Sequence, residues 1–186
     1  MAEVHAVKNK DTILLISHLL EMRHSKQMSL VWQLGINLGL RISDLLSIKF
    51  TDIKEDRLQL VESKTAKQAS ILLNTKALTL IQQLQTQYPS HEYIFQSYRS
   101  RLTRNKPPRP LSRRAVGLAF ESIGQEIKIA LGTHSMRKTR GYHLYQETKD
   151  IGRVMKMLRH SSEVHTLKYI GITQEDIDTD FKQLVL

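Results

Sequence analysis

The chain has 186 residues, enough for one domain with a substantial core but short for two full domains. It contains no cysteine, which excludes disulfides, thiolate metal sites and cysteine nucleophiles. Its formal net charge of +10 at pH 7 favours polyanions, because each phosphate that Lys or Arg neutralises releases condensed counterions. Nucleic acid is the expected partner, and the alternative is a surface that is basic only for solubility.

No part of the sequence resembles a membrane segment or a secretory leader. The start, MAEVHAVKNKDT, has no apolar stretch of signal-peptide length, and no window approaches the roughly 20 apolar residues that a spanning helix requires. We therefore expect a cytoplasmic protein without a membrane partner. The charge is uneven, because residues 170–186 contain four acidic residues and one basic residue. Such a segment is poorly suited to DNA and better suited to a basic protein surface.

The first forty residues predict two helices. Apolar residues at helical spacing indicate one helix over about 13–20, capped by Asp11 or Thr12, and a second over 28–38. Gly39 then interrupts the pattern. A turn is therefore expected after the second helix.

Arg41 follows this turn at the predicted start of a short helix. Ser43 can cap that helix, and Asp44 can either orient a guanidinium or stabilise the helix start. An arginine fixed in this way can bind an anion, whereas most arginines in such a position are simply solvated.

The next segment predicts a β-hairpin. Two short β-like runs, 58–61 and 69–73, are joined by the polar segment 63–67. Lys64 and Lys67 therefore lie at or near an exposed tip.

The rest of the sequence predicts helices and one basic loop. The expected helices cover about 76–88, 116–127 with a Ser112 cap, 134–146, 150–158, 162–170, and 173 to the end. Residues 99–114 include seven basic residues, no acidic one and several prolines, which indicates a positively charged loop. The fold class is therefore mainly α with a small β-hairpin or three-stranded sheet.

Two pairs of residues in the second half could carry chemistry. His134 and Arg137 are three positions apart, a spacing that lets two helical side chains reach one small anion. His160 and Tyr169 flank a predicted turn that can fold both toward one site. Each observation is weak alone, because such pairs arise by chance and most tyrosines are packed rather than catalytic.

Taken together, these segments resemble the tyrosine recombinase family of the phage-integrase type. Segment 39–46 (GLRISDLL) is similar to its first arginine box, 134–137 (HSMR) to its His-x-x-Arg box, and 158–170 to its terminal histidine and nucleophile box. The hairpin lysine Lys64 matches the position of the family's catalytic lysine. The resemblance spans about residues 11–178, and it implies the catalytic-domain fold of that family.

The sequence departs from the family pattern at two positions beside the boxes. Lys138 stands where His or another small or polar residue is common, and Arg159 stands where many members have Gly. We expect a single catalytic domain over 1–186, with an N-terminal tail (1–10), a core (11–169) and a C-terminal tail or helix (170–186). Because most members carry an additional N-terminal domain, the chain resembles either the short class, like the fimbrial phase-variation recombinases, or an excised catalytic domain.

The resemblance implies a chemical role for each matching residue. A free tyrosine is almost wholly protonated at pH 7, so Tyr169 needs a base to attack phosphorus, and His134 is the candidate. Two arginines suit the charge that develops on the phosphate oxygens, because they are always protonated and bidentate. The expected catalytic residues are Arg41, Lys64, His134, Arg137, His160 and Tyr169.

The remaining roles complete a scheme that requires no cofactor and no metal. His160 would donate to the phosphate, and Lys64 would protonate the leaving 5′ oxygen, with Lys67 as the alternative. Tyr169 would remain on a 3′-phosphotyrosyl end, and religation would need no ATP. The basic residues expected to contact DNA are Lys67, Arg99, Arg101, Arg104, Arg113 and Arg114.

The implied activity is site-specific recombination by integration, excision or inversion. The expected partners are double-stranded DNA with an inverted-repeat site, further copies of the chain forming a dimer to tetramer through the C-terminal tail, and accessory DNA-bending proteins on the nucleoid. Simple packing of that tail on its own domain is the alternative to docking on a neighbour. Two rival functions remain: a type IB topoisomerase, and an inactive DNA-binding accessory protein.

Overall fold

The structure, a computed structural model, describes residues 4–64, 66–97, 107–183 and 185. It is mainly helical with one small antiparallel sheet, which confirms the predicted fold class. In chain order the elements are α1 (Lys10–Arg23), α2 (Lys26–Leu38), α3 (Ile42–Ser47), η1 (Phe50–Asp52), β1 (Ile53–Lys54), β2 (Arg57–Val61), β3 (Gln68–Leu72), α4 (Thr75–Gln87), α5 (Arg113–Glu126), α6 (Ser135–Thr148), α7 (Ile151–Leu158), α8 (Glu163–Ile170) and α9 (Gln174–Gln183). Across the described ranges, no helix has the length and apolar character needed to cross a membrane.

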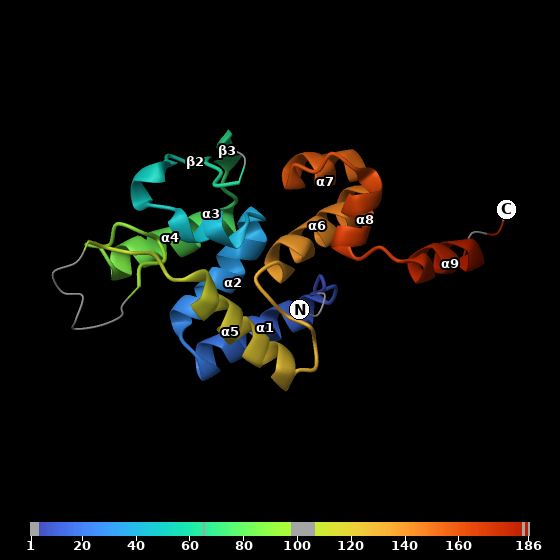
Figure 1. The fold of residues 1–186 in the computed structure, drawn as a ribbon, viewed down its shortest axis with the longest axis horizontal. Helices are drawn as coiled ribbons and strands as arrows, with labels where there is room; N and C mark the ends of the chain where they lie inside the picture. The colour runs from blue at the N-terminus through green and yellow to red at the C-terminus, as the bar shows by residue number, and fades with distance from the viewer. Residues whose placement is uncertain (1–3, 65, 98–106, 184, 186) are drawn as a thin grey trace.

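The main core lies where α1, α2 and α5 meet (Figure 1). Trp32 of α2 is fully buried and meets the ring of Phe120 in α5 edge-on, with 5.5 Å between ring centroids. Its indole N–H donates to the carbonyl of Ile13 in α1 at 3.1 Å. One amphipathic side chain therefore joins three helices and has its polar atom satisfied.

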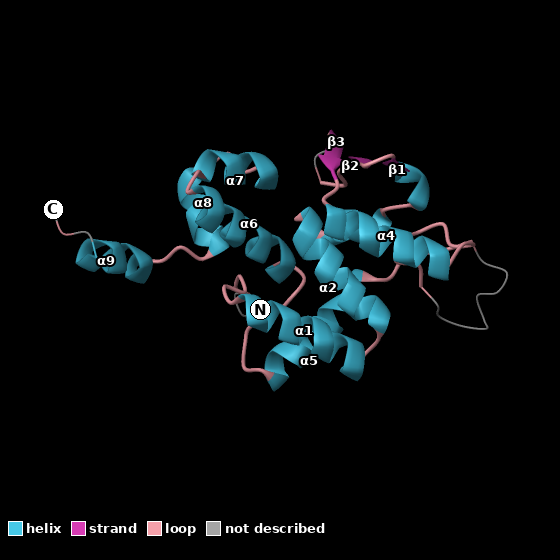
Figure 2. Cartoon of the chain, turned by 180° about the vertical axis from the view of Figure 1, so that it is seen from behind, coloured by secondary structure: helices cyan, strands magenta, loops and turns pink. Residues whose placement is uncertain are grey.

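A second, smaller core holds α7 and α8 against α6, and Figure 2 shows this group from behind. Val154, Leu158 and Ile170 are fully buried there. Gly141 of α6 permits the close approach, because an added Cβ would lie 2.7 Å from Ile170 Cγ2 and 3.3 Å from Leu158 Cδ1. The position of Tyr169, the neighbour of Ile170, depends on this contact.

The sheet has the order β1-β2-β3, and its second hairpin confirms the predicted one. Leu58 pairs with Ile71 and Leu60 with Ala69 across β2 and β3. Leu58 and Ala69 are buried while alternate residues face outward, as expected for a sheet with one covered face. In Figure 1 the sheet lies at the upper left and the α7–α8 pair at the upper right.

Two predicted helix caps are wrong. Asn9, rather than Asp11 or Thr12, caps α1, because its side-chain oxygen accepts from the backbone N–H groups of both residues. Arg41 occupies the cap position of α3 with extended backbone, so Ser43 lies inside that helix. Both helices therefore start earlier than the predicted caps indicated.

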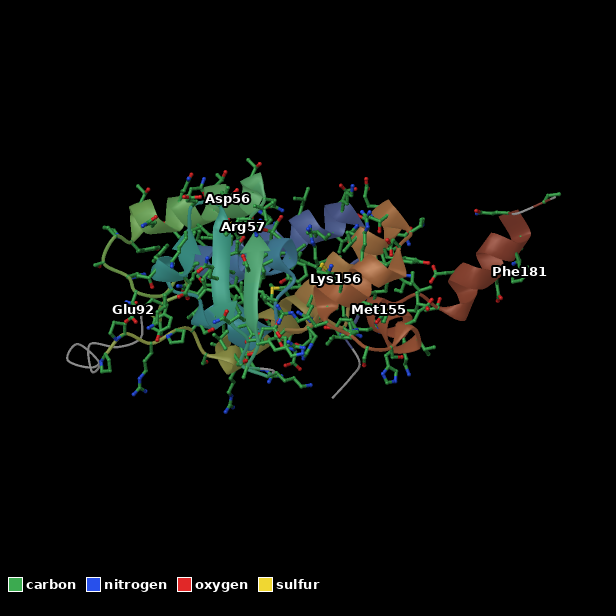
Figure 3. All side chains as sticks on the ribbon, turned by 90° about the horizontal axis from the view of Figure 1, so that it is seen from above. Asp56, Arg57, Glu92, Met155, Lys156 and Phe181 are labelled. Carbon is green, nitrogen blue, oxygen red and sulfur yellow. The ribbon has the colours of Figure 1, made fainter. Side chains whose placement is uncertain are left out.

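The α9 helix projects away from the rest of the molecule (Figures 1 and 3). Lys8 forms an exposed ion pair with Asp176 at 3.5 Å near its base. Phe181 and Val185 keep 81% and 87% of their surface exposed, so neither packs on the body of its own chain. Figure 3 shows Phe181 on the helix far from the core.

Replacing Gly141 with alanine should lower the free energy of unfolding by about 1–3 kcal/mol, because the added methyl group overpacks the α6–α8 contact. Gly117→Ala is the matched control, since its Cβ would meet Thr133 Cγ2 at an ordinary 3.8 Å. In that helix interior, alanine should stabilise by about 0.5–1 kcal/mol. Urea unfolding measures both changes, and equal stability of the two variants would contradict the packing described.

Candidate active site

A pocket of about 520 Å³ is lined by residues of the sheet side and of α6–α8. Its lining includes all six predicted catalytic residues: Arg41, Lys64, His134, Arg137, His160 and Tyr169. Lys138, Arg159 and Lys168 line it as well. The pocket is strongly basic, which suits a phosphate.

Arg41 enters the pocket from the start of α3. The preceding Gly39 has a left-handed backbone (φ 64°), which ends α2 and lets the chain turn. The Arg41 guanidinium pairs with Glu62, with 3.2 Å between Nη1 and Oε2. The hypothesis that Asp44 orients this guanidinium is wrong, because the Asp44 carboxylate instead accepts from Ser63 at the hairpin. Asp44 lies in the first turn of α3, where its negative charge interacts favourably with the positive end of the helix dipole.

Lys64 enters the pocket from the hairpin between β2 and β3. The neighbouring Ser63 is held by Asp44, whose Oδ1 accepts from the Ser63 backbone N–H at 2.9 Å. The hairpin that carries Lys64 is therefore anchored to the helix that follows Arg41. Lys67 is exposed and lies outside the pocket lining.

Arg137 lies in the first turn of α6 and is only 3% exposed. Its Nη1 donates to the carbonyl of Gly39 at 2.7 Å, and its Nη2 donates to the carbonyl of Leu158. These carbonyls stand at the ends of α2 and α7, where partial negative charge accumulates. The guanidinium is thereby fixed in orientation beside Tyr169, where its charge opposes the rise in the Tyr169 pKa that burial causes.

His134 lies directly before α6 and reaches Tyr169, with 3.4 Å between Nδ1 and the phenolic oxygen. Partial burial lowers the pKa of His134, and the positive charges of Arg113 and Arg137 lower it further. The pKa of Tyr169 is raised, because burial outweighs the opposing effect of Arg137 and Arg41. At neutral pH the pair is therefore a protonated phenol facing a neutral imidazole, the arrangement that general-base catalysis requires.

His160 lies in the turn between α7 and α8. Its Nδ1 is 3.2 Å from Thr166 Oγ1, and that hydroxyl donates to the carbonyl of Ser162 at 2.6 Å. His160 Nδ1 must therefore be the donor to Thr166, an assignment made from the hydrogen-bond pattern. Burial lowers the pKa of His160, with Arg137 and Arg41 adding to the shift. Its predicted hydrogen bond to a phosphate needs the protonated ring, which an anion in the pocket would favour.

Sequence reasoning missed three residues of the site. Glu62 is buried between two arginines, Arg159 is one of them, and Lys138 places its Nζ 5.2 Å from the ring centroid of Tyr169. Arg159 and Lys138 stood out only as departures from the family pattern. Glu62 had no signal, because a hairpin carboxylate is ordinarily solvated.

Three of the predicted DNA contacts lie within the described residues, and all three are exposed: Lys67, Arg113 and Arg114. Arg113 and Arg114 are exposed at the start of α5, and Arg113 is close enough to lower the pKa of His134. Arg99, Arg101 and Arg104 lie outside the described residues. Within the part of the chain that the structure describes, no three His, Asp or Glu side chains come together as metal ligands.

Comparison with known proteins identifies the family. A model of the phage integrase family matches residues 7–176, nearly the whole chain. The chain belongs to the phage integrase family. A Bacillus subtilis (strain 168) protein named a probable integrase/recombinase, YoeC, is 38% identical over 151 residues, which are 80% of this chain and 79% of the relative. A probable integrase/recombinase of Acholeplasma phage L2 is 24% identical, and the match covers 81% of this chain but 51% of the relative.

Solved structures of integrase-family proteins confirm the catalytic-domain fold. The XerA recombinase superimposes with a TM-score of 0.73 at 14% identity, covering 98% of this chain and 65% of that one. A lambda integrase dimer bound to a COC′ core site gives a TM-score of 0.68 at 21% identity, over 93% of this chain and 51% of that one. The match thus spans between half and two thirds of the length of these solved chains.

The electrostatic environment of His134 predicts a pKa below its ordinary value of 6.5. Histidine NMR titration should therefore find a neutral ring at pH 7, which becomes protonated only as the pH falls through this lowered value. Arg113→Ala should move the pKa up toward 6.5, because one repelling charge is lost. Arg114→Ala is the matched control with no such effect, and a pKa that responds equally to both variants would contradict this assignment.

Proposed function

We propose that the chain is a site-specific DNA recombinase that cuts and rejoins strands through a 3′-phosphotyrosyl intermediate on Tyr169. The observation that carries the proposal is the 3.4 Å approach of His134 to the Tyr169 hydroxyl in a pocket that also holds the guanidinium groups of Arg41 and Arg137. The names of the integrase/recombinase relatives support it. The chemistry is phosphoryl transfer to a tyrosine oxygen.

The first step forms a bond between the Tyr169 oxygen and the scissile phosphorus. The phenolic proton passes to Nδ1 of His134, which the lowered pKa keeps neutral and able to accept it. The bond from phosphorus to the 5′ oxygen breaks as the tyrosyl bond forms. The bond energy is kept in the phosphotyrosine, so a 5′-hydroxyl from the same or another DNA can reverse the step without ATP.

Arg41 and Arg137 stabilise the charge that develops on the non-bridging oxygens. Both are permanently charged, and Arg137 is held by backbone carbonyls before substrate arrives, so little reorganisation is needed. Loss of one such donor should cost about 10²- to 10³-fold in rate. His160, protonated by proximity to the phosphate, donates a further hydrogen bond.

Tyr169→Phe tests the proposed nucleophile. The full chain is incubated with a duplex nicked near its cleavage site, so that the short fragment released with a free 5′-hydroxyl diffuses away, religation is prevented and the covalent state is trapped. Wild type should form a covalent protein–DNA adduct visible on denaturing gels, and Tyr169→Phe should form none, because it lacks the attacking oxygen. Tyr142→Phe is the control, since Tyr142 lies outside the pocket lining.

Two outcomes would contradict the proposal. Absence of an adduct on a tightly bound cognate site would favour a DNA-binding accessory protein without catalysis. Relaxation of a supercoiled plasmid that lacks the site, without strand exchange between sites, would favour a type IB topoisomerase.

Lys64 is the proposed donor of the proton to the leaving 5′ oxygen. Lys64→Ala should slow cleavage by about 10²- to 10⁴-fold, because an alkoxide is a poor leaving group. A substrate with sulfur in place of that 5′ oxygen should restore the rate, since a thiolate leaves without a proton. At an enzyme concentration that saturates the DNA, Lys67→Ala should cleave both substrates near the wild-type rate, because loss of a phosphate contact weakens binding rather than proton transfer. A Lys64→Ala variant that remains slow on the sulfur substrate would contradict the role.

The substrate we propose is double-stranded DNA with an inverted-repeat recombination site, bound by a dimer that becomes a tetramer during exchange. Arg113, which is close enough to lower the pKa of His134, and its exposed neighbour Arg114 would hold phosphates, as would Lys67 at the hairpin. Accessory DNA-bending proteins would set the direction of the reaction on the nucleoid.

The α9 helix is the proposed contact between protomers. Its exposed Phe181 and its acidic character suit an apolar contact with a basic neighbour. Deleting 174–186, or replacing Phe181 with Ala, should weaken multimers on DNA by tenfold or more (about 1.4 kcal/mol) in gel-shift titrations, while binding to a single half-site is retained. Unaltered assembly in both variants would rule out this contact.

A further inference from the structure

One buried carboxylate joins two arginines across the active site. Glu62 is 2% exposed, and its Oε2 lies 3.2 Å from Nη1 of Arg41 and 3.0 Å from Nη1 of Arg159. The Arg41 side chain is 20% exposed and that of Arg159 is 30% exposed, so both guanidinium groups still reach the pocket. A buried charge is stable only when it is paired, and here one oxygen is paired on both sides.

The backbone of Glu62 is fixed by the hairpin. Its N–H donates to the carbonyl of Lys67 at 3.0 Å, and its carbonyl accepts from the N–H of Ala66 at 2.9 Å. The carboxylate is therefore held in place two residues before Lys64. A rigid carboxylate can orient the arginines that bind it, whereas a mobile one would follow them.

Arg159 has a backbone conformation that an arginine does not favour. It ends α7 with φ 51° and ψ 47°, in the left-handed region where glycine is the usual residue. The turn it makes is closed by the His160 N–H, which donates to the carbonyl of Met155 at 2.9 Å. Because glycine would make this turn without strain, the turn itself does not explain the arginine. Its guanidinium, bound to Glu62, does.

We propose that Glu62 and Arg159 form a positioning bridge that holds Arg41 toward the scissile phosphate and ties the hairpin to the turn that carries His160. This inference rests on the proposed recombinase function. The bridge links three separate segments that supply catalytic residues: the start of α3, the β2–β3 hairpin and the α7–α8 turn. Neither Glu62 nor Arg159 takes part in bond making.

The charge of the bridge matters as much as its geometry. Glu62 alone would neutralise Arg41 and weaken its attraction for a phosphate. The second guanidinium, from Arg159, leaves the three-residue cluster with a net charge of +1. The carboxylate can therefore orient Arg41 without cancelling the field that binds DNA.

Arg159→Gly tests the role of the guanidinium separately from that of the backbone turn. It removes the charge and also relieves the left-handed strain, which offsets part of the cost of taking one of its two partners from Glu62, so the variant should still fold. If Arg159 only shaped the turn, cleavage would be unchanged. The bridge instead predicts that the single-turnover cleavage rate on the nicked duplex falls by about 10- to 100-fold, as expected when a catalytic group is misplaced. Arg153→Ala, which removes an exposed arginine of the same helix outside the pocket, should leave the rate unchanged.

A double-mutant cycle tests whether the two residues act together. Glu62→Gln should lower the same rate, because Arg41 loses its charged partner. The double variant Glu62→Gln with Arg159→Gly should be about as slow as the worse single variant, since both changes break one bridge. A double variant whose cleavage rate falls by the product of the two single effects would overturn the bridge.

The assay distinguishes failure of the bridge from failure of the function. A wild-type chain that forms no covalent adduct on bound cognate DNA would count against the recombinase itself. An active wild type with unchanged cleavage in Arg159→Gly would overturn the bridge alone. Arg159→Asn, which also tolerates the left-handed turn, provides a second variant if glycine impairs folding, and Arg159→Lys should recover part of the rate because it keeps the charge.

Discussion

The buried guanidinium of Arg137 is the interaction on which the rest of the site depends. It bonds to the carbonyl of Gly39 at the end of α2 and to the carbonyl of Leu158 at the end of α7. Those helices belong to the two separate hydrophobic cores of the described chain. One charged side chain therefore ties the half that carries Arg41 to the half that carries Tyr169. An arginine can do this because its planar fork presents several donors at once.

The pairing of His134 with Tyr169, the proposed base and nucleophile, is a consequence of this frame. Burial makes Tyr169 harder to ionise and His134 harder to protonate, so the proton remains on the phenol until a phosphate is in reach. The surrounding arginines lower both pKa values, so they oppose the effect of burial on Tyr169 and reinforce it on His134. A resting site of this kind holds the proposed nucleophile, Tyr169, in its neutral form.

The sequence predicted the elements, and it predicted the six side chains that the structure brings together in one pocket, because both leave local signals. Residues only a few positions apart carry the signals for helical spacing, for the Ser112 cap and for the alternation of the hairpin. The boxes around Arg41, His134 and Tyr169 have a fixed order and spacing, and the pocket brings all three together. The prediction that failed concerned a contact between segments that are distant in the sequence. Glu62 rather than Asp44 binds Arg41, and no local pattern distinguishes a buried carboxylate from a solvated one.

The end of α8 has a consequence for how the protein can be controlled. Gly171 closes that helix in a left-handed conformation, and the N–H of Ile172 donates to the carbonyl of Leu167, so the last turn is complete without any help from α9. Ile170, fully buried against Gly141, fastens the same turn to α6. The hydroxyl of Tyr169 is thus mechanically insulated from the projecting tail. Removing α9 would therefore leave the helix of Tyr169 intact, so that the proposed protomer contact and the proposed chemistry could be altered separately by mutation.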